Sequence, residues 1–312
     1  MLRDLRKAEV GQFNTLITRE FPQEGALLGI DVDAQRRILA RAFQPLFRFL
    51  LGFARLVRHP IVRFFVVESE GRVAATAVLS YGRRAGYIGA VSVDPAFRRR
   101  GLGRQVIGGC AADAKATGRE FVVLDVIHDN APAQALYRSV GYRPLRTGAF
   151  LRKDLAARPA PLPRPPGVRP LRRSDRKPLA AIAAAALPPE VARILPVEPG
   201  SFTLAPVIVR FLESETEAWV IDDGRGPVAF LRGTVGRAMQ SGNLTSPILA
   251  PDLSTERSLE FLRYAESWLA SKGVPRAVVE QWSDPPRVID LLRSGGWVEA
   301  IPIDTLYLPL HA

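Results

Sequence analysis

Short apolar runs rich in β-branched and aromatic residues follow one another in the first half of the chain. Two of these runs, 63–69 and 73–81, are separated by Glu70 and Gly71, a pair that favours a hairpin turn. A third run, 87–93, is ended by an Asp-Pro pair. The pattern therefore predicts a meander of three strands.

Helical spacing alternates with strand character after this meander. Apolar residues recur at every third or fourth position over 102–117, whereas 121–127 is an almost continuous apolar run, typical of a buried parallel strand. Asn130 is suited to cap a helix over 131–140, and 145–155 again has strand character. This order predicts a mixed α/β domain in which helices cover both faces of the sheet.

The second half of the chain repeats the first. Three pairs of segments echo one another in the same order: 2–9 with 168–175, 65–74 with 219–229, and 135–142 with 290–297. Strand runs at 218–222, 228–235 and 277–281 and a helical pattern over 255–272 complete the second set. Ordered echoes of this kind indicate an internal duplication.

A proline-rich stretch separates the two copies. Six of the thirteen residues from 158 to 170 are proline, which excludes a helix or a central strand and predicts an extended linker. We therefore expect a first domain over 1–157, a linker over 158–170 and a second domain over 171–312.

Charge and composition narrow the ligand class. The 312 residues are 47% hydrophobic and carry a net charge of +12, with +11 in 1–157, +5 in 158–176 and −4 in 177–312. An anionic ligand is therefore expected on the first domain.

With one cysteine and three histidines, neither a metal site nor an internal disulfide is expected. The sequence has no signal-like or membrane-spanning run, so we expect a soluble, cytoplasmic protein.

The most specific local pattern is the stretch from Val93 to Gly103, where a strand ends, a basic loop follows and a helix begins. A helix N-terminus attracts phosphate through unpaired N–H groups and a partial positive charge. Gly101 and Gly103 would let an oxyanion approach the backbone. Forked cationic donors come from Arg98, Arg99, Arg100 and Arg104. The stretch predicts a pyrophosphate site, the alternative being a solvated basic turn; its spacing fits neither a P-loop nor a Rossmann fingerprint.

Two motifs resemble those of the GNAT family of acyltransferases. The Pro-x-x-Arg-x-x-Gly-x-Gly spacing from Pro95 to Gly103 is similar to the acetyl-CoA motif of that family. The stretch from Asp129 to Tyr142, Asp-Asn-Ala-Pro-Ala-Gln-Ala-Leu-Tyr-Arg-Ser-Val-Gly-Tyr, resembles its second motif. The resemblance covers about residues 60–155 and implies two tandem GNAT-like domains, each a mostly antiparallel twisted sheet flanked by helices.

The resemblance also implies how acetyl-CoA, the co-substrate, would be held. Strands 87–93 and 121–127 would part around the pantetheine arm, 98–104 would contact the pyrophosphate, Asn130 would meet the pantetheine, and Tyr137 would act as general acid beside the thioester sulfur. The full set of implied contacts is Val91, Ser92, Val93, Arg98, Arg99, Arg100, Gly101, Leu102, Gly103, Arg104, Asn130, Ala133 and Tyr137.

The general base is less clearly marked. Strand 87–93 carries no carboxylate, although many relatives have one there, which leaves Asp125, Ser92, His128 or a water chain. Asp125 could equally be a paired structural carboxylate, His128 a surface residue, and Tyr137 an aromatic side chain packed on the sheet.

The second copy lacks the matching chemistry. Residues 249–259 contain Pro251 but no glycine pair, Glu256 adds negative charge, and Leu292 stands where the first copy has Tyr137. We expect a degenerate domain that scaffolds the first or walls the acceptor site. The basic, Leu- and Phe-rich segment 33–59 of the first copy is expected to cover the acceptor site or a domain interface, rather than to lie on a membrane.

These patterns predict an N-acetyltransferase that moves an acetyl group from acetyl-CoA to a primary amine by direct attack within a ternary complex. The alternative is a non-catalytic acyl-CoA-binding or sensor protein, and a nucleic-acid binder is the weakest interpretation. The acceptor is a small-molecule or peptide amine; its identity, the acyl chain and the oligomeric state leave no signal in the sequence.

Overall fold

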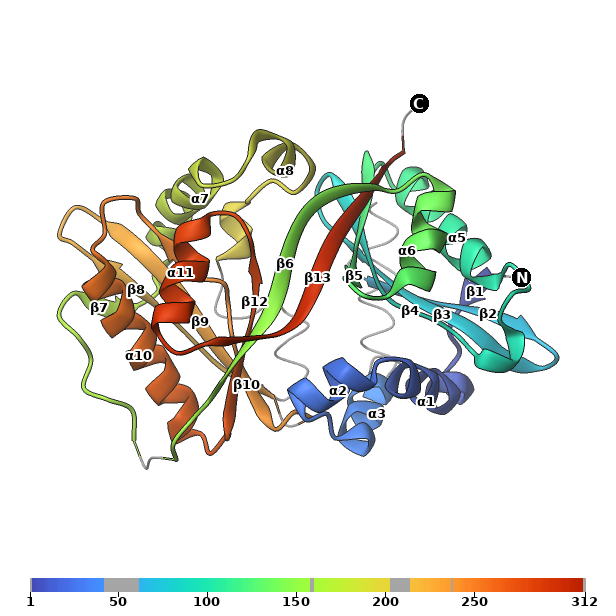
Figure 1. The fold of residues 1–312 in the computed structure, drawn as a ribbon, viewed down its shortest axis with the longest axis horizontal. Coiled ribbons are helices and arrows are strands. Elements are labelled where there is room, and N and C mark those ends of the chain that lie inside the picture. The colour runs from blue at the N-terminus through green and yellow to red at the C-terminus, as the bar shows by residue number, and fades with distance from the viewer. Residues whose placement is uncertain (1, 42–61, 158–159, 203–213, 237, 311–312) are drawn as a thin grey trace. The chain divides into compact units, whose positions relative to one another are not determined.

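The computed structural model describes residues 2–41, 62–157, 160–202, 214–236 and 238–310 (Figure 1). The chain forms two compact units, and each contains segments from both halves of the sequence. Unit 1 comprises residues 1–25, 32–145 and 303–312, and unit 2 comprises residues 26–31 and 146–302.

The sheet of unit 1 contains the predicted meander. Its strands lie in the order β1 (Leu2–Asp4), β2 (Val62–Ser69), β3 (Arg72–Tyr81), β4 (Ala85–Val93), β5 (Phe121–Ile127) and β13 (Val298–Pro309). The β4–β5 pair is parallel and the other pairs are antiparallel. Glu70 and Gly71 both have positive φ and form the predicted hairpin turn.

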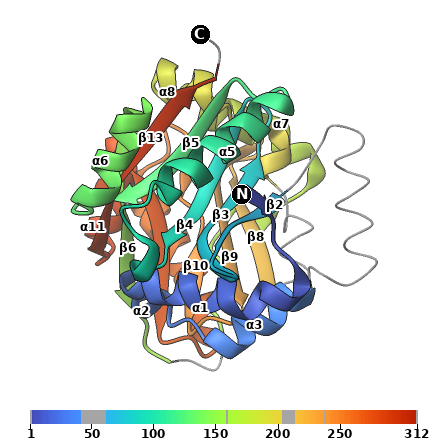
Figure 2. The same ribbon diagram turned by 90° about the vertical axis from the view of Figure 1, so that its right-hand side faces the viewer.

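Helices cover both faces of this sheet. One face carries α5 (Leu102–Ala116) and α6 (Ala131–Val140), and the other carries α1 (Val10–Glu20) with α3 (Val32–Arg41) against it; α2 (Pro22–Leu28) connects α1 and α3 in the sequence. Figure 2 shows α5 lying across β3 and β4. Successive side chains of β2 point to opposite faces of the sheet and contribute to a hydrophobic core on each face. Phe65 and Val67 pack beneath α5, while Val66 packs beneath α1. Short 3₁₀ turns occur at η1 (Lys7–Glu9) and η2 (Pro95–Phe97).

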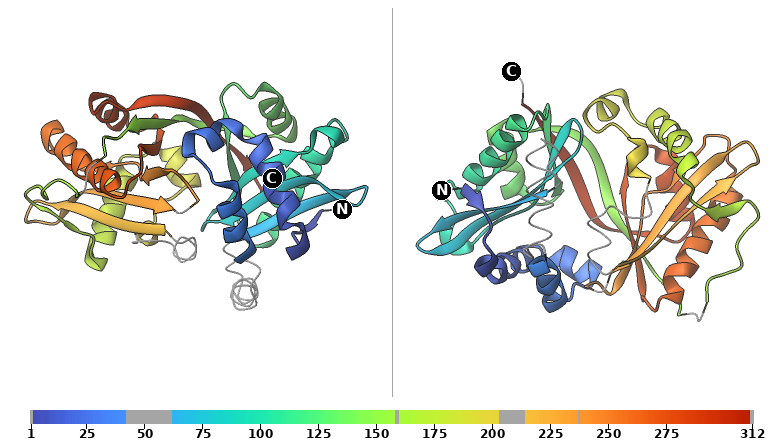
Figure 3. Two further views of the ribbon diagram at one scale, coloured as in Figure 1. Left: turned by 90° about the horizontal axis from the view of Figure 1, so that it is seen from below. Right: turned by 180° about the vertical axis from the view of Figure 1, so that it is seen from behind.

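Unit 2 is built in the same way. Its strands lie in the order β6 (Arg143–Asp154), β12 (Arg276–Trp282), β10 (Ser241–Leu244), β9 (Pro227–Gly236), β8 (Ser214–Asp222) and β7 (Val168–Pro170), with β11 (Ile248–Leu249) paired to β9. Helices α10 (Thr255–Ser271) and α11 (Pro286–Ser294) pack on one face, and α7 (Arg176–Ala185) packs on the other (Figure 3). The remaining elements are η3 (Arg173–Asp175), α8 (Pro189–Ile194) and η4 (Pro199–Ser201).

The two units exchange their last strands. Residues 148–154 of β6, from the first copy, pair with β12 in unit 2. Residues 303–309 of β13, from the second copy, pair with β5 in unit 1. The expected division of the chain at the proline-rich stretch does not include this exchange of strands. The pairing that produces it joins residues more than 120 positions apart.

The proline-rich stretch belongs to unit 2. Its last three residues form β7, an edge strand, where proline is tolerated. The backbone N–H of Leu162 donates to Oγ of Ser267 on α10 at 2.8 Å, so the stretch is held along that helix. The part of segment 33–59 from residue 42 onward lies outside the described residues.

The duplication is visible in matching contacts. Arg3 binds Glu9 in the first copy, and Arg169 binds Asp175 at the repeated position in the second.

Within the described ranges, no helix is long and apolar enough to cross a membrane. The same ranges contain no cluster of metal-ligating side chains.

Candidate active site

Strands β4 and β5 part in the middle of the sheet of unit 1. Their register covers only the first four residues of β4 and ends with Ile88 opposite Leu124. On the other side of β4, the register with β3 shifts between Thr76 and Val78, and Ala90 has a φ of +51°. This bulge turns the second half of β4 away from β5, so the expected parting of the two strands is present.

The loop after β4 leads to an open helix N-terminus. Asp94 accepts a hydrogen bond from the backbone N–H of Ala96 at 3.0 Å, and Phe97 is buried, so the start of the loop is anchored. Gly101 caps α5 with a φ of +78°, and a Cβ atom there would meet nothing within 4 Å. Arg99 also has a positive φ, +64°, a conformation that non-glycine residues rarely adopt.

The arginines of the loop have different partners. Arg98 donates through Nε to the carbonyl of Val93 at 3.2 Å, and its guanidinium also binds Glu20 at the end of α1. Arg100 pairs with Glu70 at 2.7 Å, and Arg104 donates to the hydroxyl of Ser139 at 2.9 Å. Arg99 is exposed.

Gly103 serves helix packing. A Cβ atom at this position would lie 2.9 Å from Cδ2 of Leu136 on α6, so the missing side chain lets α5 approach α6. Leu102 and Ala133 are partly buried and pack against the core between these helices and the sheet. An oxyanion therefore has open space to approach the backbone at Gly101. The α6 side of Gly103 is filled by Leu136.

Asn130 and Tyr137 lie on α6. The side-chain oxygen of Asn130 accepts from the backbone N–H of Ala133 at 3.2 Å, which is the N-cap predicted for this helix. Tyr137 is only 6% exposed, and its ring packs against that of Tyr142 at a centroid distance of 5.7 Å. Burial raises the pKa of Tyr137 to about 12.

Asp125 lies beside the point where the strands part. It follows Leu124, the last residue of β5 that is paired with β4. One carboxylate oxygen accepts from Oγ1 of Thr305 at 2.7 Å, and the other accepts from the hydroxyl of Tyr87. Asp125 is thus a paired carboxylate at the vertex of the splayed strands.

His128 and Ser92 have other surroundings. Nδ1 of His128 lies 3.0 Å from Oδ2 of Asp304, and the His128 side chain is 59% exposed. Ser92 is 3% exposed, and its hydroxyl has no hydrogen-bond partner within the described ranges. His128 lies four positions beyond Leu124, at the end of β5, so it is farther along the parted strands than Asp125.

Three residues that contact these candidates, Tyr87, Asp304 and Thr305, have no motif to mark them in the sequence. Tyr87 is on a predicted strand outside both motifs, and Asp304 and Thr305 lie 176 and 180 positions from His128 and Asp125, the candidates they contact. The signal in the sequence is the adjacent polar pair of Asp304 and Thr305 within the mostly apolar last strand.

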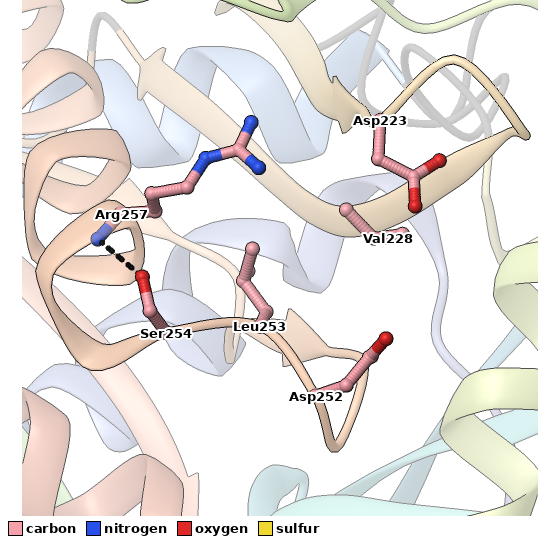
Figure 4. Close-up of a pocket in the computed structure, with 6 residues that line it drawn as sticks. All are labelled: Asp223, Val228, Asp252, Leu253, Ser254 and Arg257. Carbon is pink, nitrogen blue, oxygen red and sulfur yellow. Dashed lines mark hydrogen bonds between the residues drawn. The ribbon is translucent and has the colours of Figure 1, made fainter.

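The second unit has a parallel strand pair of the same length but not the basic loop. Strand β10 pairs with β12 over four residues, from Ser241 opposite Arg276 onward, as β4 does with β5. A pocket of about 220 Å³ lies at the start of α10 and is lined by Asp223, Val228, Asp252, Leu253, Ser254 and Arg257 (Figure 4). Leu292, at the position of Tyr137, is fully buried.

Comparison with known proteins agrees with these features. Residues 30–142 match the acetyltransferase (GNAT) family. The chain is 34% identical over 76 residues to the ribosomal protein bS18-alanine N-acetyltransferase of Salmonella typhimurium; the match covers 24% of this chain and about half (51%) of that relative.

Solved structures match over the whole chain. A tandem GNAT protein from the clavulanic acid biosynthesis pathway has a TM-score of 0.63 at 13% identity, covering 100% of this chain and 99% of that one. A GCN5-related N-acetyltransferase from Sphaerobacter thermophilus has a TM-score of 0.64 at 19% identity, covering 100% and 96%. Residues 30–142 are therefore similar to the GNAT acetyltransferase family, and the chain has the fold of these tandem GNAT structures.

Proposed function

We propose that unit 1 transfers an acetyl group from acetyl-CoA to a primary amine. The observation that carries this proposal is the parting of β4 and β5 beside an open, basic helix N-terminus at Gly101. The backbone of residues 91–93, which is not paired with β5, would bind the pantetheine arm, and the N–H groups at the start of α5 with the arginines of 98–104 would bind the pyrophosphate.

The transfer needs one base and one acid. A lysine-like amine with a pKa of about 10.4 is neutral in only about one molecule in 2,500 at pH 7, so the attacking amine must lose a proton. Its nitrogen bonds to the thioester carbonyl carbon, the carbon–sulfur bond breaks, and the departing sulfur takes up a proton. The acetylated amine and the free thiol of coenzyme A are the products.

Asp125 is the preferred base and Tyr137 the preferred acid. Asp125 lies next to the vertex of the parted strands, whereas His128 lies at the edge where the parallel strands end and the basic loop begins. The phenol of Tyr137 stays protonated at neutral pH, because burial raises its pKa to about 12, and it can therefore donate to the thiolate.

The acceptor that we propose is a primary amine. The name of the Salmonella relative describes an alanine N-acetyltransferase, so a peptide with an N-terminal alanine is the first acceptor to test, followed by small amines. We propose a scaffolding role for the second domain, since the loop before α10 and the first turn of that helix carry Asp252 and Glu256 beside Arg257, in place of a basic glycine loop.

The pyrophosphate site is tested by paired glycine variants at the two ends of α5. Gly101 and Gly118 have φ values of +78° and +83°, and at both positions a Cβ atom would enter open space. Gly101→Ala and Gly118→Ala therefore introduce the same backbone strain, each costing on the order of 1 kcal/mol of stability. We expect only Gly101→Ala to weaken acetyl-CoA binding, by tenfold or more in isothermal titration calorimetry.

Equal affinities in the two glycine variants would contradict the pyrophosphate site. Release of the coenzyme A thiol in the presence of an amine tests the reaction itself. Tight acetyl-CoA binding without thiol release for any amine would instead favour the non-catalytic acyl-CoA-binding protein.

A further inference from the structure

The last strand of the second copy lies beside the site of the first. In β13, Asp304 is paired with Val126 and Thr305 with Asp125. Successive side chains of a strand point to opposite faces, so these two polar residues reach different parts of the site. Thr305 is 1% exposed and the side chain of Asp304 is 15% exposed, so both are enclosed.

Thr305 holds the carboxylate at the vertex. Its hydroxyl donates to one oxygen of Asp125 at 2.7 Å, and the hydroxyl of Tyr87 donates to the other oxygen. With both oxygens bound from two neighbouring strands, the carboxylate has one orientation. A base must be held in the correct direction to take a proton from the attacking amine.

Asp304 holds the turn that follows β5. Its Oδ2 accepts from Nε2 of Gln134 at 3.0 Å and lies 3.0 Å from Nδ1 of His128. The amide of Gln134 also donates to the backbone carbonyl of His128 at 2.6 Å. These contacts tie the end of β5 to the first turn of α6, where Asn130 forms the cap.

The first copy's own last strand cannot provide these partners. At the repeat offset of about 155 residues, the counterparts of Asp304 and Thr305 are Ala149 and Phe150 in β6, which pair with β12 in unit 2. Alanine and phenylalanine side chains have no hydrogen-bonding atom. The polar contacts at the site therefore depend on the exchange of strands.

We propose that the second copy completes the acetyl-transfer site of unit 1 through β13, in which Thr305 positions Asp125 and Asp304 positions the turn between β5 and α6. This inference rests on the proposed function. It gives the tandem arrangement a direct part in the reaction, because the two positioning side chains come from the copy that lacks the basic loop.

Thr305 is tested by removing and restoring its hydroxyl in the full-length protein. Thr305→Val keeps the shape of the side chain and is expected to lower kcat about tenfold, the effect of losing a hydrogen bond to a charged group, with the acetyl-CoA Kd unchanged. Thr305→Ser should restore most of kcat. Thr216→Val is the matched control. It removes a hydroxyl on β8 that is hydrogen-bonded to the hydroxyl of Thr234 in unit 2, and it should have the kcat of the wild type.

Asp304 is tested by binding. Asp304→Ala, which installs the residue of the first copy's own strand, should raise the acetyl-CoA Kd about tenfold through loss of two polar contacts. Asp304→Asn, which retains an acceptor for Gln134, should have a smaller effect. Melting temperatures show that each variant is folded; should Thr305→Val not fold, Thr305→Cys replaces the hydroxyl with a thiol, a weaker donor.

The outcomes separate the two proposals. Wild-type kcat and Kd in folded Thr305→Val and Asp304→Ala, with turnover by the parent protein, would overturn the role of β13 alone. Absence of both acetyl-CoA binding and turnover in the parent protein would overturn the proposed function and this inference with it.

Discussion

At the scale of single residues, two neighbouring tyrosines are equally buried but differ in their expected role. Tyr137 and Tyr142 are 6% and 4% exposed, and burial raises the pKa of both phenols. The hydroxyl of Tyr142 has no hydrogen-bond partner within the described ranges. Only Tyr137 is among the residues that the resemblance to the GNAT family implies as acetyl-CoA contacts, so the pair offers a test variant and a matched control.

Tyr137→Phe should lower kcat by about 10²-fold with little change in acetyl-CoA affinity, because only the proton donor is lost. In the wild-type protein, the pKa of about 12 keeps the phenol of Tyr137 protonated, so ionisation of this phenol should cause no fall in rate below about pH 11. Tyr142→Phe removes an unpartnered buried hydroxyl and should leave kcat unchanged. Steady-state kinetics against pH measure these effects; equal rates in both variants would remove Tyr137 from the mechanism.

At the scale of elements, one ion pair recurs at the start of each copy. Arg169 binds both oxygens of Asp175 at 2.7 and 2.8 Å, and the backbone N–H of Arg172 donates to the same carboxylate at 2.7 Å. Arg3 and Glu9 form the corresponding pair beside η1. These bonds fix the chain between the first strand of each copy and the helix that follows.

Asp175→Asn should reduce the free energy of unfolding by about 2 kcal/mol at pH 7, since the side chain is 3% exposed and accepts charge-assisted bonds. The hydrogen bonds from Arg169 lower the pKa of Asp175, so its stabilisation is present above the unfolded value of about 3.9. That stabilisation is lost as the pH falls through the lower folded pKa.

Denaturant titrations of wild type and Asp175→Asn from pH 7 to pH 2 measure this dependence. Glu9→Gln, at the repeated position, should show a smaller loss, because the side chain of Glu9 is 16% exposed. A difference between Asp175→Asn and wild type that stays constant down to pH 2 would contradict the assigned role of the carboxylate.

At the scale of the whole molecule, the exchange of strands means that each unit contains a strand from the other copy of the repeat. A fragment of residues 1–157 contains the basic loop and α6 but lacks β13, which pairs with all seven residues of β5. Its own 148–154 segment is the repeat counterpart of 303–309, so in the fragment it can occupy the same edge of β5, with Ala149 and Phe150 in place of Asp304 and Thr305.

Fragment 1–157 should therefore melt at a lower temperature than the full chain and bind acetyl-CoA about tenfold more weakly. A chimera in which 301–312 replace the repeat counterparts 146–157 should regain affinity, since it restores Asp304 and Thr305 to the strand beside β5. Thermal melts and calorimetry compare the two proteins. A fragment that binds acetyl-CoA as tightly as the full chain would show that β13 is dispensable.

Local sequence by itself determined the elements of the first copy and the loop at the start of α5. Strands 63–69, 73–81 and 121–127 and the Asn130 cap follow from apolar period, turn residues and capping chemistry, which act over a few residues. Tertiary structure alone decided which strand lies beside β5. Two repeat-related strands compete for that edge, and the pairing that brings Thr305 to Asp125 joins residues 180 positions apart, where no local pattern acts.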